Sequence, residues 1–259
     1  MARKVSRRKE PNREDYRLKE KMKIEEDIFD TRTMLRFSKL FDRGIISELH
    51  FKIATGKEAD IYLAVPGVKV KEDIVVVKVF RAETSTFRNR MQYITGDPRF
   101  GRIKSDIHSV VNEWCKKEFG NLKVAEMAGV HAPRPYAFSG NILTMEFIGR
   151  DGMPARTLKD EKTEMPEETL DTILGDVKKL YGMGLVHADL SEYNVLMKKS
   201  TPYLIDFGQA VVLEHRNAME FLHRDINTIL TYFKKTYGIE RNTEKTFKDI
   251  TGRDYSGIS

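Results

Sequence analysis

Alternating patterns of apolar and polar residues predict the order of elements along the chain. Residues 74–80 are β-branched and bounded by charge, which predicts a strand. The preceding run, residues 53–65, contains two strand-like segments separated by a glycine turn, and Pro66-Gly67 predicts the next turn. These short connections predict an antiparallel meander.

Apolar residues at helical spacing predict the remaining large elements. Helices are expected over residues 18–46 (one or two), 110–128, 168–183 and 218–237. Short strands are expected over residues 142–145, 194–197 and 203–205, with a polar turn ending at Pro202 between the last two. Glycines follow two of the helices, Gly44 and Gly129, where a helix commonly stops.

These elements predict an α+β chain resembling a trimmed, two-lobed protein kinase. Residues 1–50 would form a basic arm and a helical extension, and residues 51–145 a lobe with an antiparallel sheet and one helix. Residues 146–259 would form a mainly helical lobe. The polar stretch 81–107 is predicted to be a flexible, functional loop within the first lobe.

Composition predicts a cytoplasmic protein without a membrane span. No run approaches the roughly 18 apolar residues that a span requires. The N-terminus is charged and lacks the pattern of a secretory signal. Cys115 is the single cysteine, which excludes a disulfide within the chain and fits a reducing compartment.

The net charge is concentrated at the N-terminus. Residues 1–23 contain ten Lys/Arg and four Asp/Glu, and the resulting +6 equals the net charge of the whole chain. Such a segment can contact the phosphate backbone of a nucleic acid, with release of counterions. A charged tail that only aids solubility is the alternative interpretation, and the sequence leaves both open.

The main chemical motif is His187-Ala188-Asp189-Leu190-Ser191-Glu192-Tyr193-Asn194. An aspartate and an asparagine five residues apart on a loop can face one centre. Asp189 would orient an attacking hydroxyl or water, and the amide oxygen of Asn194 would bind Mg²⁺. Asp206 follows an apolar strand and supplies a second metal ligand. Each motif alone fits ordinary turn chemistry, but their order and spacing match the catalytic and metal loops of protein kinases.

Lys78 lies inside the strand 74–80 and would need a partner for its charge. In a kinase-like lobe such a lysine contacts nucleotide phosphates and pairs with a carboxylate on the next helix. Glu118 and Glu113 are both candidates, with Glu118 favoured. A lysine that reaches solvent from an edge strand is the alternative.

Two backbone segments are candidates for nucleotide contacts. The run Thr55-Gly56-Lys57-Glu58-Ala59 could cover phosphates with its N–H groups, although its single glycine also fits a plain hairpin turn. Met145, Glu146 and Ile148 lie where the chain would cross between lobes and could offer backbone groups to adenine.

The sequence resembles the RIO family of atypical protein kinases, in particular the first (Rio one) branch and its archaeal members. The strings that carry the resemblance are the two motifs beginning at Thr55 and His187, Ile205-Asp206-Phe207-Gly208-Gln209-Ala210, Glu118-Phe119-x-Asn121-Leu122-Lys123 and Met219-Glu220-Phe221-Leu222-x-Arg224-Asp225. About fifty residues precede the first strand, which argues against the branch that carries an N-terminal winged-helix domain.

The resemblance implies ATP with Mg²⁺ or Mn²⁺ as cofactors, serine/threonine autophosphorylation, ATPase activity and a role in maturation of the small ribosomal subunit. By the same resemblance, Asp189 is the catalytic aspartate, Asn194 and Asp206 hold the metal, and Asp206 can be transiently phosphorylated. The hydroxyls of the flexible loop and its border are the candidate autophosphorylation sites: Thr84, Ser85, Thr86, Ser105 and Ser109.

Three functions remain open at the level of sequence. The first is a RIO-type serine kinase that acts on itself or on a ribosome-associated protein. The second is an ATP-hydrolysing switch on a pre-ribosomal particle, because residues 209–216 are too short for a peptide-docking activation segment. The third, a small-molecule phosphotransferase, is disfavoured because few residues are left for additional C-terminal helices.

Overall fold

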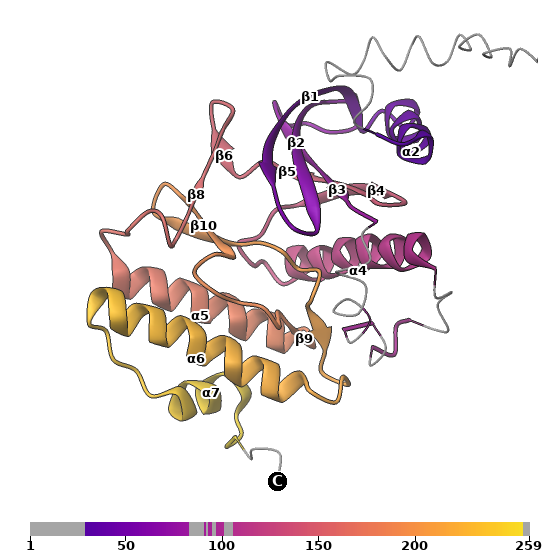
Figure 1. The fold of residues 1–259 in the computed structure, drawn as a ribbon. Helices are drawn as coiled ribbons and strands as arrows, with labels where there is room; N and C mark the ends of the chain where they lie inside the picture. The colour runs from indigo at the N-terminus through magenta and orange to yellow at the C-terminus, as the bar shows by residue number, and fades with distance from the viewer. Residues whose placement is uncertain (1–28, 83–90, 92, 95–96, 101–105, 256–259) are drawn as a thin grey trace, which may run out of the picture.

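The computed structural model describes residues 29–82, 91, 93–94, 97–100 and 106–255, and its chain forms two lobes (Figure 1). The N-terminal lobe is a five-stranded antiparallel sheet in the order β1-β2-β3-β5-β4. Its strands are β1 (Ile46–Thr55), β2 (Ala59–Pro66), β3 (Val75–Phe80), β4 (Pro135–Ser139) and β5 (Ile142–Glu146). The predicted meander corresponds to β1, β2 and β3.

Two helices cover opposite faces of this sheet, α2 (Thr31–Asp42) and α4 (Ile107–Met127). Side chains of a strand alternate between faces, so Val77 and Val79 pack towards α2 while Lys78 points towards α4. The side chain of Asp30 caps α2 by accepting a hydrogen bond from the Thr33 N–H at 2.7 Å. The sheet therefore holds a hydrophobic layer on one side and a charged side chain on the other.

The C-terminal lobe is mainly helical, with α5 (Pro166–Gly182), α6 (Ala218–Tyr237) and α7 (Thr243–Thr251). Its short strands are β6 (Gly149–Arg150), β7 (Met153–Pro154), β8 (Arg156–Thr157), β9 (Leu185–Val186), β10 (Val195–Lys198), β11 (Thr201–Leu204) and β12 (Val211–Val212). The predicted turn ending at Pro202 is wrong, because Pro202 lies inside β11. That strand is at the edge of the sheet β11-β10-β8, where proline is tolerated.

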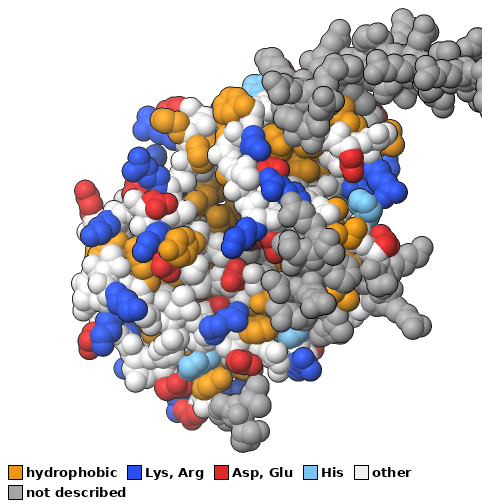
Figure 2. Space-filling model, viewed as in Figure 1, with side chains coloured by type: hydrophobic (Ala, Val, Ile, Leu, Met, Phe, Trp, Pro, Cys, Tyr) orange, Lys and Arg blue, Asp and Glu red, His pale blue; other side chains and the backbone are white. Residues whose placement is uncertain are grey.

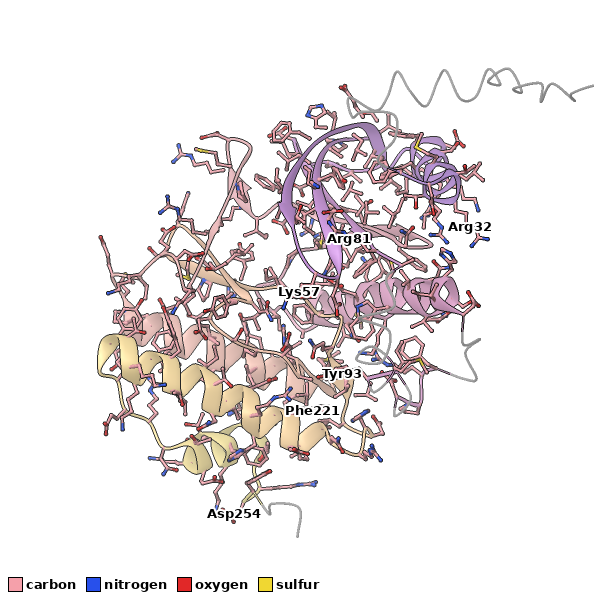
Figure 3. All side chains as sticks on the ribbon, in the orientation of Figure 1. Arg32, Lys57, Arg81, Tyr93, Phe221 and Asp254 are labelled. Atoms are coloured by element: carbon pink, nitrogen blue, oxygen red, sulfur yellow. The ribbon has the colours of Figure 1, made fainter. Side chains whose placement is uncertain are left out.

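The predicted fold class, an α+β chain with a trimmed kinase-like arrangement, is confirmed. Residues 18–28 of the first predicted helical segment lie outside the described residues. Within the stretch 81–107, Tyr93 is buried and its ring packs against those of Trp114 and Phe221, with centroid distances of 6.2 and 5.6 Å (Figure 3). In the part of the chain that the structure describes, no helix is long and apolar enough to span a membrane.

Candidate active site between the lobes

Lys78 joins the two lobes through three hydrogen bonds. Its ammonium donates to both carboxylate oxygens of Glu118, at 2.8 and 2.9 Å, and to Oδ1 of Asp206 at 3.0 Å. Burial by itself lowers the pKa of Lys78, but the charges of Asp206 and Glu118 raise it further than burial lowers it. The lysine is therefore charged at neutral pH.

Two alternatives left open by the sequence are resolved by this geometry. Glu118 is the partner of Lys78, whereas Glu113 pairs with Lys116 at 3.2 Å on the outer side of α4. The edge-strand alternative for Lys78 is wrong, because β3 is the central strand of its sheet.

Asp189 and Asn194 lie on the loop between β9 and β10, as their spacing predicts. The amide nitrogen of Asn194 donates to the backbone carbonyl of Asp189 at 2.8 Å and to its Oδ2 at 3.2 Å. Gln209 also donates to Oδ2 of Asp189, at 2.9 Å. Two amides thus hold one carboxylate oxygen of Asp189 and fix its orientation.

The backbone is strained at both loops of this centre. Ala188 and Asp206 have φ values of 63° and 64°, a left-handed conformation that non-glycine residues rarely adopt. The buried carboxylate of Asp225 in α6 accepts hydrogen bonds from the backbone N–H groups of Ala188, at 2.7 Å, and Leu190, at 3.1 Å. These bonds stabilise the strained loop that carries Asp189.

The two central aspartates have different electrostatic surroundings. Burial, followed by the nearby charge of Asp206, raises the pKa of Asp189 to about 6. The Lys78 ammonium lowers the pKa of Asp206. Asp206 is consequently ionised at neutral pH, and Asp189 can bind or release a proton close to neutrality, as a general base requires.

The segment Thr55-Gly56-Lys57-Glu58-Ala59 forms the turn between β1 and β2. The N–H of Gly56 donates to the carbonyl of Ala59 at 2.9 Å, which closes the turn. Figure 3 shows Lys57 at the end of this hairpin, where the hairpin faces the C-terminal lobe. The space-filling view shows a recess between the two lobes (Figure 2).

Met145, Glu146 and Ile148 lie at the end of β5 and in the crossing to the C-terminal lobe. The N–H of Glu146 donates to the Arg134 carbonyl at 2.8 Å, and the Ile148 carbonyl accepts from the Ala155 N–H at 3.0 Å. Since these two groups are already used within the chain, contacts to a base would fall on the other backbone groups of this crossing.

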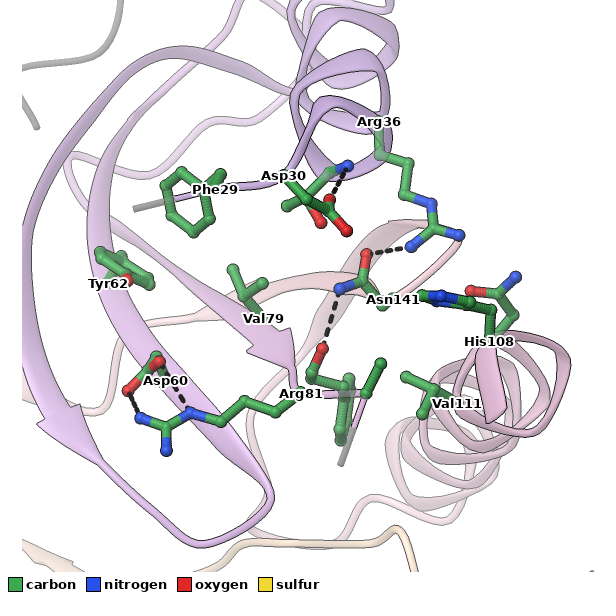
Figure 4. A pocket seen from close by; sticks show the side chains of 14 residues that line it. Phe29, Asp30, Arg36, Asp60, Tyr62, Val79, Arg81, His108, Val111 and Asn141 are labelled. Atoms are coloured by element: carbon green, nitrogen blue, oxygen red, sulfur yellow. Dashed lines mark hydrogen bonds and ion pairs between the residues drawn. The ribbon is translucent and has the colours of Figure 1, made fainter. Parts of the chain in front are cut away.

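A second hollow, of about 310 Å³, lies on the face of the sheet opposite Lys78, between α2, the sheet and the first turn of α4 (Figure 4). A bidentate ion pair between Arg81 and Asp60, with distances of 2.7 and 3.0 Å, lies at one end. At the other end, Arg36 donates to the side-chain oxygen of Asn141. The sheet separates this hollow from the centre at Asp189 and Asp206.

Some contacts of the centre were not predicted from the sequence. Gln209 and Asp225 fall inside the motifs that carry the family resemblance, but their hydrogen bonds to Asp189 and its loop have no local signature. The same holds for Lys117 and Asn121 of α4, which contact the segment after Asp206. Among the described residues, no group of three or more His, Cys, Asp or Glu side chains could hold a metal ion.

The family model for the RIO domain matches residues 60–246. The chain belongs to the RIO family. Its similar relatives include the RIO-type serine/threonine-protein kinase Rio1 of Haloferax volcanii, 36% identical over 252 residues, which cover 96% of this chain and 86% of that protein. The Rio1 kinase of Thermoplasma acidophilum is 41% identical over 185 residues, which cover 71% of this chain and 95% of that protein. The predicted RIO resemblance and its first branch are confirmed, and the chain is an atypical serine/threonine kinase of this family.

Solved structures support the same fold. The Rio2 kinase–ADP/Mg²⁺–phosphoaspartate complex from Chaetomium thermophilum matches this RIO chain with a TM-score of 0.65 at 22% identity, covering 88% of this chain and 70% of that one. The lobes and the cleft between them are thus those of a RIO kinase.

Proposed function

We propose that this RIO chain transfers the γ-phosphoryl group of Mg²⁺–ATP (or Mn²⁺–ATP) to a serine or threonine hydroxyl, including one of its own. The observation that carries the proposal is the convergence of Asp189, Asp206 and the Lys78–Glu118 ion pair between the lobes. A general base, an ionised carboxylate and a buried cation are the groups that phosphoryl transfer needs.

The donor set fits a magnesium ion. Asn194 uses its amide nitrogen on Asp189, so that its amide oxygen points away from that carboxylate, and the Asp206 side chain is 46% exposed. Both are hard oxygen donors, and Mg²⁺ commonly takes one or two protein ligands together with substrate phosphates and water. When bound, the ion would neutralise charge on the phosphate oxygens.

The remaining residues would position the nucleotide. Lys78 would contact phosphate oxygens from β3, with Glu118 fixing its ammonium. Residues 55–59 (Thr55, Gly56, Lys57, Glu58 and Ala59) would cover the phosphates, and backbone groups near Met145, Glu146 and Ile148 would face the adenine.

Asp189 would act as the base in the transfer step. Its Oδ2 is held by Asn194 and Gln209, so Oδ1 would accept the proton of the attacking hydroxyl. The hydroxyl oxygen forms a bond to the γ-phosphorus as the bond between that phosphorus and the ADP oxygen breaks.

Asp206 offers a second route, consistent with ATPase activity. Its carboxylate would attack the γ-phosphorus and release ADP, and water would then hydrolyse the acyl phosphate. The alternative function, an ATP-driven switch that binds pre-small-subunit ribosomal particles through residues 1–23 in the cytoplasm, would use this route. The charge of residues 1–23 supports that alternative.

Replacement of Asp189 by Asn tests the proposed kinase activity. With radiolabelled ATP, we expect acid-stable phosphate on serine or threonine to fall at least a hundredfold, while an exposed aspartate replacement, Asp160→Asn, leaves it unchanged. Phosphate that is instead labile to hydroxylamine and lost in Asp206→Asn would favour the ATPase route. Phosphopeptide mapping identifies the modified hydroxyl; Thr84, Ser85, Thr86 and Ser105 lie outside the described residues, and Ser109 lies in the first turn of α4.

A further inference from the structure

Helix α4 holds the backbone that follows Asp206. Lys117 donates from Nζ to the carbonyl of Gly208 at 2.9 Å and to that of Ala210. Asn121, one turn further along α4, donates from Nδ2 to the carbonyls of Phe207, at 2.7 Å, and Ala210, at 3.0 Å. Three carbonyls of the 207–210 segment are therefore bound by two side chains of one helix.

These two side chains are placed where polar groups are costly. Lys117 and Asn121 are 1% and 0% exposed. A buried ammonium is unfavourable unless it is paired or hydrogen-bonded, and Lys117 makes its printed hydrogen bonds only to backbone carbonyls. An apolar side chain of similar length would fill the same space without that penalty. The contacts to the 207–210 segment therefore distinguish Lys117 from a packing residue.

The 207–210 segment touches the phosphoryl-transfer centre at two points. Asp206 precedes it directly and binds Lys78, and Gln209 within it donates to Asp189. A displacement of the segment would move the metal-loop carboxylate and the amide that orients the base together. Helix α4 also carries Glu118, so one rigid element controls three of the contacts in the centre.

A further side chain fixes which way the Asn121 amide faces. Arg99 donates from Nη1 to Oδ1 of Asn121 at 2.8 Å, and it is itself held by Asp97, which is 3% exposed. With its oxygen engaged by Arg99, the amide directs both of its N–H bonds at the 207–210 segment. Residues 97–100, far from the centre in sequence, thereby contribute to its geometry.

We propose that Lys117 and Asn121 are positioning residues for phosphoryl transfer, which hold the 207–210 segment so that Asp206 and Gln209 reach their partners, with Arg99 orienting Asn121. The consequence for catalysis rests on the proposed function. The consequence for the segment itself does not.

Trp114 provides a direct readout, because it is the single tryptophan of the chain and its ring packs on Gly208. A Cβ built at Gly208 would lie 2.9 Å from the indole nitrogen. We expect Asn121→Ala and Lys117→Met to change the emission maximum and the acrylamide quenching of Trp114. In the same proteins, kcat and kcat/KM should fall together by at least tenfold, with the KM for ATP within threefold of the wild-type value.

Matched replacements on α4 serve as controls. Asn112→Ala and Lys116→Met change the same residue types without touching the 207–210 segment, and should leave emission and kcat within twofold of wild type. Lys117→Gln retains an N–H donor and should recover part of the loss seen in Lys117→Met. If either Lys117 or Asn121 variant fails to fold, Arg99→Ala, at a side chain that is 32% exposed, tests the same link with an expected loss of threefold or more.

Three results would separate the proposals. Folded Asn121→Ala, Lys117→Met and Arg99→Ala proteins with wild-type emission and kcat would overturn the positioning role. Equal losses in the Asn112→Ala and Lys116→Met controls would also overturn it, since α4 would then act without these contacts. A wild-type protein without Asp189-dependent transfer would refute the proposed function, while the Trp114 emission still decides whether the segment is held.

Discussion

The carboxyl group of Asp189 lies among charges that act on it in opposite directions. Burial and the neighbouring Asp206 raise its pKa to about 6, while Arg224 and the Asn194 hydrogen bond favour the ionised form. A base must be ionised to accept a proton, so activity should be lost below this pKa and retained above it. We expect kcat/KM to rise through a midpoint near pH 6 and to level off above it. A rate profile that is flat between about pH 5 and 8 would contradict the assignment.

The ion pair of Lys78 and Glu118 should be sensitive to removal of one partner. Their side chains are 10% and 1% exposed, so Lys78→Met leaves a buried carboxylate that keeps Asp206 as a repulsive neighbour. We expect a loss of about 3–5 kcal/mol in the free energy of unfolding, measured with urea. The double replacement Lys78→Met/Glu118→Leu should recover stability without recovering phosphoryl transfer.

The exposed pair on the same helix is the control for this measurement. Lys116 and Glu113 lie one turn apart on the outer face of α4, at 3.2 Å. Lys116→Met should change stability by less than about 1 kcal/mol. If both lysine replacements were equally mild, the buried pair would not be an important contributor to stability.

At the residue scale, the sequence predicted those site residues that belong to recognisable motifs. Asp189, Asn194 and Asp206 could be paired because their types and spacing have a chemical meaning. Glu113 and Glu118 could not be separated in the same way, because five positions along a helix change the face by about 140° and the orientation of the helix is a tertiary property. Lys117 and Asn121 were missed since their partners are backbone carbonyls 86 to 93 residues away.

At the scale of elements, the attachment of α2 to the sheet depends on a glycine. Gly140, with a φ of 59°, lies in the turn between β4 and β5, and a Cβ there would be 2.2 Å from Nε of Arg36. Asn141, the next residue, binds Arg36 and also donates to the Phe80 carbonyl at 2.8 Å. The turn therefore ties α2 to the end of β3.

We expect Gly140→Ala to destabilise the protein by about 1–3 kcal/mol, because it combines a strained backbone with a clash. Hydrogen exchange should accelerate first in the amides of α2. Gly120→Ala is the matched control, since Gly120 lies inside α4 with nothing within 4 Å of its Cβ position. That replacement should stabilise α4 by about 0.5–1 kcal/mol. Destabilisation in both variants would argue against a specific role of the turn.

Element boundaries followed from the sequence where one signal dominated. Helix α6 matches its predicted span because a long apolar stripe, which includes Phe221, Ile229 and Phe233, faces the core. Helix α7 has nine residues and buries two of them, Phe247 and Ile250, so its period is too short to read. Strand β1 starts at Ile46, within the segment assigned to the extension, because its first residues are mostly polar and its pairing with β2 decides its limits.

At the scale of the whole molecule, one hydrophobic core connects the lobes. It contains Phe80 and Leu143 of the sheet, Trp114 of α4, and Phe207 and Phe221 of the C-terminal lobe. The predicted domain division therefore marks a change of architecture, while packing is continuous through α4. A change in the position of α4 would be felt on both sides of the cleft, which agrees with the contacts of Lys78, Lys117 and Asn121 around Asp206.

The charge distribution yields a prediction about the whole chain. All of the net +6 charge belongs to residues 1–23, which contain ten Lys/Arg. If these residues contact RNA, replacing the ten basic residues with Gln should weaken binding and reduce its salt dependence. Each lost phosphate contact lowers the slope of log K against log salt by roughly 0.7–0.9. Titrations of a small-subunit RNA fragment at several salt concentrations measure this slope.

The catalytic centre provides an internal control for that experiment, because Asp189 and Asp206 are held by contacts within residues 78–225. Phosphoryl transfer should therefore stay within twofold of wild type while the RNA affinity falls. A second variant with the same composition of residues 1–23 in shuffled order should bind RNA with the original slope, since the contact depends on charge. An unchanged slope in the Gln variant would leave residues 1–23 as a charged tail that aids solubility, and RNA recognition would then have to come from the folded lobes.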